Sequence, residues 1–361
     1  MTSPELSEPE KALIVGISGP SSSGKTTLAR LLQRIFCGVS LDPSLSLSSD
    51  AKGNDKLNTF IIHEDDFYYP DDHDYSRIPY TTTPTGKTVQ DWDTSAAIDT
   101  SFLAQALSYV RANGHLPPRL QSKEDQNEDA GPCVPDTLVT ELRREVEARL
   151  ASAQMARSST LVFMEGFLLY APPEGYEYKN KGKDGGAGDE HYPTDHGVLR
   201  PVHDQIGLPL FLPAAYATVK ARREGRSGYV TIGPAPEPPV TNTATNPSTT
   251  APEKEKNQNE EIDLEGEDDR PPQNFWTDPP GYVDDIVWPR YVRDHAWLLV
   301  DGDGEGEGEG ERDIVQRVGE GVEVRGDVGV NVAPGKGAVG MEVVLRWAVE
   351  EVVAFYLGEE K

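Results

Sequence analysis

The residues with the clearest chemistry lie in a short loop near the N-terminus, between Gly19 and Thr26. They fit the spacing G-x-x-x-x-G-K-[ST], in which glycines let the backbone wrap closely around phosphates and amide N–H groups point inward as donors. Lys25 is placed to reach the β- and γ-phosphates as a point charge, and the Thr26 hydroxyl is placed to ligate Mg²⁺. We therefore predict that the phosphates of a nucleotide bind to these residues: Gly19, Ser22, Ser23, Gly24, Lys25, Thr26 and Thr27.

Apolar residues on both sides of this loop predict the elements that hold it. Residues 12–15 form a short apolar run typical of a buried strand, and Leu28, Leu31, Leu32 and Ile35 recur at helical spacing after the loop. The loop is therefore expected at a strand-to-helix turn, with the helix N-terminus facing the phosphates.

Acidic residues follow two other predicted strands. Residues 59–63 form an apolar, partly β-branched run that ends at Glu64 and Asp65, and residues 160–164 form a second run that ends at Glu165. In open parallel sheets, ligands bind beyond the carboxyl ends of the strands, so these positions favour function. Asp65 is our candidate for the general base that draws a proton from an acceptor hydroxyl. The alternative is that neighbouring acids form a solvated turn.

A basic cluster lies on a predicted helix at residues 214–226. Its charges are Lys220, Arg222, Arg223 and Arg226, in a chain whose net charge is −27. Simple surface solvation is the alternative explanation for this cluster. Together with the phosphate loop and the acids, however, it describes phosphoryl transfer to a small acceptor, in which Lys25, Mg²⁺ and the arginines carry most of the rate.

Trp92 and Asp93 lie at the predicted start of a helix that spans residues 94–112. Asp93 in this position can be a simple N-cap, and Trp92 can be a hydrophobic staple against the core. This structural interpretation is the alternative to a role in binding the acceptor.

Further patterns predict an α/β protein with one domain, residues 1–361, and long insertions. Strands are predicted at residues 208–212 and 296–300, and amphipathic helices at 138–150 and 341–357. Four polar, low-complexity stretches are predicted as insertions, at about residues 40–58, 116–135, 174–207 and 231–272.

Composition excludes several classes of protein. The strong negative charge argues against general nucleic-acid or membrane-surface binding, because both need basic faces. Cys37 and Cys133 lie outside any C-x-x-C spacing, so neither a disulfide framework nor a zinc site is expected. The N-terminus lacks an apolar signal region, and no apolar run approaches the roughly 20 residues that span a bilayer. We therefore expect a soluble, cytoplasmic protein.

A calcium site at residues 301–312 is rejected, because position twelve of the loop is Arg312 instead of glutamate.

Several motifs occur together and in a fixed order along the chain. They are the loop from Gly19 to Thr26, Glu64-Asp65-Asp66-Phe67, Gln90-Asp91-Trp92-Asp93, Glu165-Gly166-Phe167-Leu168-Leu169, Arg222-Arg223 with Arg226, Asp278-Pro279-Pro280-Gly281-Tyr282 and Val287-Trp288-Pro289. In this set the chain resembles the nicotinamide riboside kinases, which belong to the uridine kinase-like branch of P-loop kinases. The resemblance extends from Leu13 to about Asp301 and is interrupted by the insertions.

This resemblance implies a P-loop NTPase fold with a five-stranded parallel sheet flanked by helices. It also implies ATP as donor, Mg²⁺, and transfer to the 5′-hydroxyl of nicotinamide riboside, which gives nicotinamide mononucleotide for NAD synthesis. The roles that it implies are a base at Asp65, Mg²⁺ contacts at Thr26 and Glu165, ribose contacts at Asp93 and Arg223, stacking on the pyridine ring by Trp92 and by Tyr229, nucleotide binding by Arg222, and a lid over the phosphates that carries Arg226. Arg226-Ser227-Gly228-Tyr229 has one residue more before the tyrosine than the family pattern leads us to expect.

Two other functions remain as alternatives. A uridine/cytidine kinase or another small-metabolite kinase would share most of these motifs. A GTP-binding switch protein would share the phosphate loop and would use an N-K-x-D motif, which residues Asn180 to Lys183 begin, although Asp184 arrives one residue late.

Overall fold

The computed structural model describes residues 11–41, 56–70, 77–120, 133–152, 158–173, 196–226, 229–232, 264–265, 273–299 and 325–359. Its centre is a five-stranded sheet in the order β2-β5-β1-β6-β9, in which every neighbouring pair is parallel. The strands are β1 (Ala12–Ser18), β2 (Asn58–His63), β5 (Thr160–Gly166), β6 (Leu208–Phe211) and β9 (Asn331–Val332). The predicted α/β class and parallel sheet are thereby confirmed.

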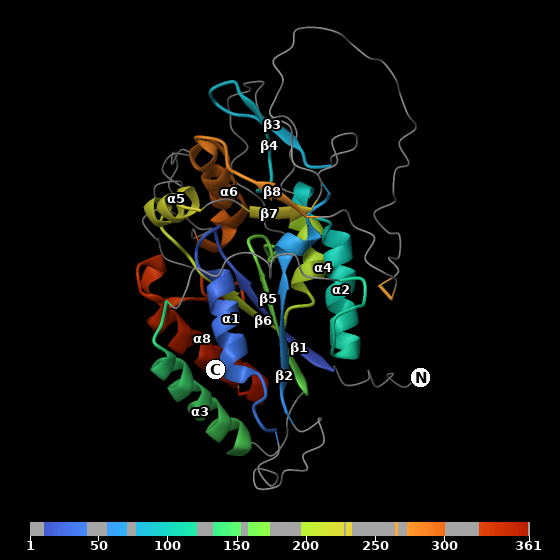
Figure 1. Ribbon diagram of the computed structural model, residues 1–361, viewed down its shortest axis with the longest axis vertical. Helices are drawn as coiled ribbons and strands as arrows, with labels where there is room; N and C mark the ends of the chain where they lie inside the picture. Colours follow the sequence, from blue (N-terminus) through green and yellow to red (C-terminus); the bar gives the residue numbers. More distant parts are fainter. Residues whose placement is uncertain are drawn as a thin grey trace.

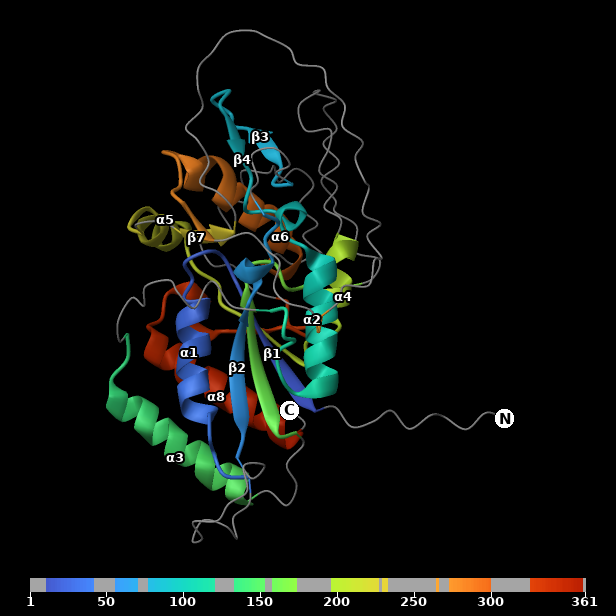
Figure 2. The ribbon, with the colours of Figure 1, turned by 45° about the vertical axis from the view of Figure 1, so that its right-hand side comes forward.

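Helices cover both faces of this sheet (Figure 2). On one face lie α1 (Lys25–Phe36), α3 (Asp136–Ser152) and α8 (Met341–Leu357), and on the other lie α2 (Thr100–Asn113) and α4 (Arg200–His203). Helix α6 (Trp288–Leu299) lies beyond the carboxyl ends of the strands (Figure 2) and adds apolar side chains to the second core. Successive side chains of a strand point to opposite faces, so β1 contributes to both cores. Leu13, Val15 and Ile17 pack with the first group of helices, whereas Ala12 and Ile14 pack with the second. This explains why β1 is an unbroken apolar run rather than an alternating one.

The predicted fifth strand at residues 296–300 is wrong. Residues 296–299 belong to α6, and the fifth strand is β9, which has only two residues. The apolar run at 296–300 is too short to separate strand from helix by itself. The residues before this run indicate a helix, because Trp288, Tyr291, Val292 and His295 are all buried and lie at helical spacing.

Smaller elements form a layer beyond the carboxyl ends of the sheet strands (Figure 1). This layer contains the antiparallel pair β3 (Tyr80–Thr82) and β4 (Thr88–Gln90), helix α5 (Tyr216–Glu224), and the antiparallel pair β7 (Tyr229–Ile232) and β8 (Gln273–Trp276). A π-helical turn, Val283–Val287, leads directly into α6. The layer therefore faces the edge of the sheet at which ligands bind in α/β folds.

The structure describes only parts of the predicted insertions. Residues 196–207, which we predicted as the end of an insertion, form a 3₁₀ turn and α4, and Val202 is fully buried. This insertion therefore ends earlier than predicted, because Leu199, Val202 and Ile206 bring apolar side chains at helical spacing. The remaining residues of all four insertions are largely outside the described part, so their character and the single-domain division stay predictions. No helix among the described residues is long and apolar enough to cross a membrane.

Candidate active site

The phosphate loop connects β1 to α1, as the sequence predicts. Gly19 has φ +153°, and a Cβ at this position would lie 2.3 Å from the carbonyl oxygen of Leu212, so only glycine fits. Ser22 has φ +63°, a conformation that residues other than glycine rarely adopt. Strain of this kind is typical of a ligand-binding loop.

Three side chains of the loop are arranged for an anion. Lys25 is almost buried, and its Nζ donates a hydrogen bond to the Pro20 carbonyl at 3.0 Å. The hydroxyls of Ser22 and Ser23 are buried without a hydrogen-bond partner. Burial lowers the pKa of Lys25, and the negative charges of Glu165 and Asp65, which favour the protonated form, only partly offset this effect. Because buried polar groups are costly when unpaired, the two hydroxyls indicate a missing partner with oxygen acceptors, as phosphate has.

The acid at the end of β5 contacts the loop directly. The Thr26 hydroxyl donates to Glu165 Oε1 at 3.0 Å, and His63 Nδ1 lies 2.7 Å from the same oxygen. Since an ionised carboxylate only accepts hydrogen bonds, the proton lies on His63 Nδ1. Burial alone would raise the pKa of Glu165, but the His63 bond and the Lys25 charge outweigh it, and the pKa is lowered.

These oxygen donors suit Mg²⁺, which binds proteins through one or two oxygen ligands and completes its shell with phosphates and water. The described residues contain no group of three or more His, Cys, Asp or Glu side chains that could hold a metal ion by themselves. A hydroxyl and a single ionised carboxylate beside a phosphate loop therefore fit a magnesium–nucleotide complex. The sequence alone does not predict the part played by His63. Its position in the register, directly opposite Glu165, is what brings the two together.

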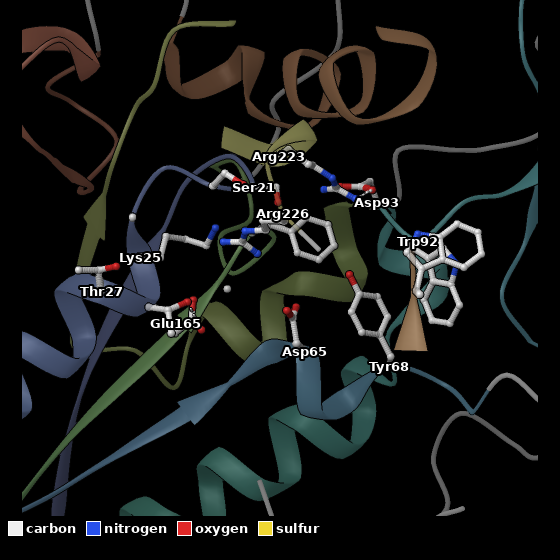
Figure 3. A pocket seen from close by; sticks show the side chains of 16 residues that line it. Ser21, Lys25, Thr27, Asp65, Tyr68, Trp92, Asp93, Glu165, Arg223 and Arg226 are labelled. Carbon is white, nitrogen blue, oxygen red and sulfur yellow. Dashed lines mark hydrogen bonds and ion pairs between the residues drawn. The ribbon is translucent and has the colours of Figure 1, made fainter. Parts of the chain in front are cut away.

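Asp65 projects into the same space from the turn that follows β2. Figure 3 shows its carboxylate facing the region toward which Lys25 and Arg226 also point. Burial and the charge of Glu165 raise the pKa of Asp65 to about 6, with Lys25 opposing. The neighbours Glu64 and Asp66 are buried, so this segment is not a solvated turn.

Glu64 connects the ends of β2 and β5 through hydrogen bonds. Its Oε2 accepts the backbone N–H groups of Phe167 at 2.6 Å and Leu168 at 3.0 Å. Burial raises the pKa of Glu64 to about 8, with these two amides opposing and the charge of Asp65 adding to the rise. Glu64 is therefore a neutral acid at pH 7 that holds the segment after Glu165.

Asp93 and Arg223 form a buried ion pair. Arg223 Nη1 and Nη2 bind Asp93 Oδ1 and Oδ2 at 2.9 and 3.1 Å, and Arg223 Nε binds Asp278 Oδ2 at 2.7 Å. The predicted N-cap role of Asp93 is wrong, because α2 begins at Thr100 and Asp99 caps it by accepting the Phe102 N–H. Asp99 lies next to the first helical turn, whereas a separate 3₁₀ turn at Ser95–Ala97 keeps Asp93 away from it.

Aromatic rings line the site beside Asp93. The Trp92 ring lies 5.4 Å from the Tyr68 ring and 5.6 Å from the Trp276 ring, between centroids, and Trp276 Nε1 donates to Asp278 Oδ1 at 3.0 Å. Tyr68 and Trp276 were not among the predicted site residues. Trp276 lies two residues before the motif Asp278 to Tyr282, to which the sequence analysis assigned no site residue. The predicted stacking residue Tyr229 pairs with Trp276 through its backbone, and its side chain is outside the described part.

Most of these side chains line one cleft that holds about 820 Å³ of space, part of it open to solvent. Eleven predicted site residues line it: Ser22, Gly24, Lys25, Thr26, Thr27, Asp65, Trp92, Asp93, Glu165, Arg223 and Arg226. Of the others, Gly19 and Ser23 belong to the loop behind the lining, and Arg222 Nη1 donates to the Ser22 carbonyl at 3.1 Å.

No family model matches the chain, but three curated fungal proteins named nicotinamide riboside kinase are similar to it. The protein from Schizosaccharomyces pombe is 28% identical over 293 residues, which are 81% of this chain and 83% of that protein. Those from Eremothecium gossypii and Saccharomyces cerevisiae are 24% and 23% identical, again over 81% of this chain and over 79% and 82% of their own lengths. Agreement across three species, over most of each chain, supports the resemblance seen in the motifs. The chain is therefore similar to nicotinamide riboside kinases over most of its length.

Proposed function

We propose that the protein transfers the γ-phosphoryl group of ATP to the 5′-hydroxyl of nicotinamide riboside, which gives nicotinamide mononucleotide. The observation that carries this proposal is a single cleft with a phosphate loop at one end, an aromatic and acidic wall at the other, and Asp65 between them (Figure 3). The names of the three similar proteins agree with it.

The donor end stabilises phosphate charge. Lys25 and Arg226 supply positive charge beside the inward-facing loop, and Arg222 is held on the loop backbone through Ser22. Thr26 and Glu165 would hold Mg²⁺, which supplies charge neutralisation on the phosphate oxygens when it is bound. Because phosphoryl transfer depends mainly on positioning and electrostatics, these groups carry most of the rate enhancement.

The acceptor end fits a riboside with a positively charged ring. Asp93, oriented by Arg223, accepts hydrogen bonds from ribose hydroxyls. Trp92, Tyr68 and Trp276 offer ring faces and edges to the pyridinium, which aromatic faces favour by about 0.5–2 kcal/mol depending on desolvation. Tyr229 stays a candidate for stacking.

Asp65 draws the proton from the 5′-hydroxyl as the oxygen attacks phosphorus. Its raised pKa makes the carboxylate more basic than an ordinary aspartate while it remains mostly ionised at pH 7. The Glu64 bonds to Phe167 and Leu168 keep the neighbouring strand end in place during this step.

Uridine or cytidine kinase activity is the alternative for the same cleft, since Asp93 and Arg223 would serve any riboside. The rings of Trp92 and Trp276 favour the charged pyridinium over a neutral pyrimidine. A GTP-binding switch would not need this acceptor wall, and its candidate motif at residues 180–184 lies outside the described residues. We place the reaction in the cytoplasm.

The test is a coupled assay of ATP consumption by the purified protein, with and without nicotinamide riboside, followed by mass spectrometry of the product. Uridine and cytidine serve as competing acceptors, and GTP replaces ATP in a parallel series. We expect the largest kcat/KM with nicotinamide riboside. A larger kcat/KM with uridine, or nucleotide hydrolysis that no acceptor stimulates, would contradict the proposal.

A further inference from the structure

The segment that carries Trp92 and Asp93 is irregular, yet it forms the acceptor wall of the cleft. It follows β4, which ends at Gln90, and α2 does not begin until Thr100. Its two functional side chains line the cleft, whereas Asp91, the residue before Trp92, is fully buried and does not. Such a segment needs contacts from elsewhere to keep two neighbouring side chains aimed at a ligand.

Tyr282 supplies the first of these contacts. Its hydroxyl accepts the Trp92 N–H at 3.0 Å and donates to the Gln90 carbonyl at 3.1 Å, so one oxygen joins both sides of Asp91. The ring of Tyr282 also lies 5.6 Å from the Arg223 guanidinium carbon and 6.1 Å from the Trp276 ring. One buried tyrosine therefore contacts three parts of the acceptor end.

Arg290 supplies the second contact. Its Nε and Nη2 bind Asp91 Oδ2 at 2.8 and 2.7 Å. Tyr282 and Arg290 lie on either side of the π-helical turn Val283–Val287, a feature that often occurs at functional sites. This turn leads into α6, which is packed against the sheet core through Trp288 and Tyr291. The contacts thus connect the irregular segment to a rigid part of the fold.

We propose that Tyr282, Arg290 and Asp91 are positioning residues for acceptor binding, which hold Trp92 and Asp93 in the orientation that nicotinamide riboside needs. None of the three lines the main cleft, so each acts through the backbone or the charge that it holds. The inference rests on the proposed function, since it assigns these residues to the acceptor and not to the nucleotide.

The sharpest variant is Tyr282→Phe, which keeps the ring and removes only the hydroxyl. We expect it to raise the KM for nicotinamide riboside by roughly 3- to 10-fold, as the loss of one or two hydrogen bonds allows, and to leave the KM for ATP unchanged. Tyr356→Phe is the matched control, because Tyr356 is equally buried and donates its hydroxyl to the Ser158 carbonyl far from the cleft. We expect the control to change neither KM.

The ion pair is tested by neutralising one or both partners. Arg290→Met leaves a buried carboxylate unpaired and should lower the Tm, whereas Asp91→Asn/Arg290→Met removes both charges and should recover much of it. If the pair positions the acceptor wall, the double variant still has a raised KM for nicotinamide riboside, despite its recovered stability. Glu351→Gln is the control, because Glu351 is a buried acid outside the cleft that accepts a hydrogen bond from Asn331 in the edge strand β9.

The outcomes separate the two proposals. No turnover of nicotinamide riboside by the wild-type protein would overturn the proposed function, and this inference with it. Normal wild-type turnover, together with an unchanged KM for nicotinamide riboside in both Tyr282→Phe and the double variant, would overturn this inference alone. Equal rises in the KM values for riboside and ATP would also overturn it, because they would indicate a general loss of structure.

Discussion

Three carboxylates, Glu64, Asp65 and Glu165, lie at the ends of β2 and β5, and their surroundings give them different charges. Burial raises the pKa of Glu64 to about 8 and that of Asp65 to about 6, whereas His63 and Lys25 lower the pKa of Glu165. Titratable groups whose environments separate their pKa values usually have separate roles. Here the ionised Glu165 suits cation binding and Asp65 suits proton transfer. The neutral Glu64 accepts hydrogen bonds from two backbone N–H groups.

The first prediction concerns Asp65 as the base. The carboxylate must be ionised to accept a proton, so kcat/KM should fall below pH 6, by about tenfold for each pH unit. Asp65→Asn should lower kcat by roughly 10²- to 10⁴-fold and remove this acidic limb. Rate profiles from pH 5 to 8 for both proteins check it. An acidic limb that persists in Asp65→Asn would assign the proton transfer to another group, with Glu165 the next candidate.

The second prediction concerns Glu64 and stability. Because folding raises its pKa from 4.5 to about 8, the unfolded chain binds fewer protons than the native protein between these values, and the free energy of unfolding falls as pH rises. Glu64→Gln keeps an oxygen acceptor for Phe167 and Leu168 but has no proton to lose. Its Tm relative to wild type should therefore increase from pH 5 to pH 8 and level off above that.

Thermal melts at several pH values measure this difference. A Tm difference independent of pH would show that Glu64 has an ordinary pKa in the folded protein. Glu64→Ala, which removes the acceptor for both amides, should lower the Tm at every pH.

At the scale of elements, the sequence predicts those with strong periodicity and misses those that depend on partners. The loop with its flanking β1 and α1 follows from local pattern, as do β2, β5 and α8. A two-residue strand such as β9 has no periodicity, and only its pairing with β6 defines it. Trp276 likewise reaches the site only because β8 pairs with β7 across a long connection.

The third prediction concerns the aromatic residues. Trp92→Ala and Trp276→Ala should each raise the KM for nicotinamide riboside by roughly 5- to 150-fold, since stacking on an aromatic ring contributes about 1–3 kcal/mol. The effect on kcat should be smaller, because stacking stabilises ground state and transition state alike. Asp93→Ala should instead impair every riboside and lower kcat. An unchanged KM in Trp92→Ala would make Trp92 a core residue and remove its role in acceptor choice.

The fourth prediction concerns the connection between β7 and β8. Residues 236–260 are polar and nearly free of large apolar side chains, so replacing them with a short Gly/Ser linker should preserve activity and Tm. Roughly halving the connection changes its closure free energy by only about 0.6 kcal/mol.

Removing residues 246–270 deletes the same length of chain but also takes Leu264 and Glu265. The Leu264 carbonyl accepts the Arg119 N–H, its side chain packs against the core, and Glu265 accepts from the Tyr109 hydroxyl. This second deletion should have the lower Tm, as measured by calorimetry. Equal Tm values would show that the contacts of Leu264 and Glu265 do not stabilise the fold.

For the whole molecule, the site is assembled from six stretches of chain that meet at one edge of the sheet. The phosphate loop, the ends of β2 and β5, the Trp92 segment, α5 and β8 each contribute side chains to the cleft. Lys25 and Arg226 bring positive charge to this edge of a protein with a net charge of −27, so an anionic nucleotide meets local positive charge. Ligands that contact several stretches at once should stabilise the fold as a unit.

The last prediction follows from this assembly. A ligand at about 100 times its Kd adds roughly 2.7 kcal/mol to the free energy of unfolding. For a folded part of about 150–250 residues, the range into which the described part of this chain falls, each kcal/mol raises the Tm by about 2–4 °C. We expect nicotinamide riboside, and separately a non-hydrolysable ATP analogue with Mg²⁺, each to raise the Tm by roughly 5–10 °C at that concentration. Lys25→Ala should lose the nucleotide shift and keep the riboside shift, whereas Asp93→Ala should do the reverse. If either variant lost both shifts while its ligand-free Tm matched that of wild type, donor and acceptor would not occupy separate ends of the cleft, and the assignment of its two ends would be wrong.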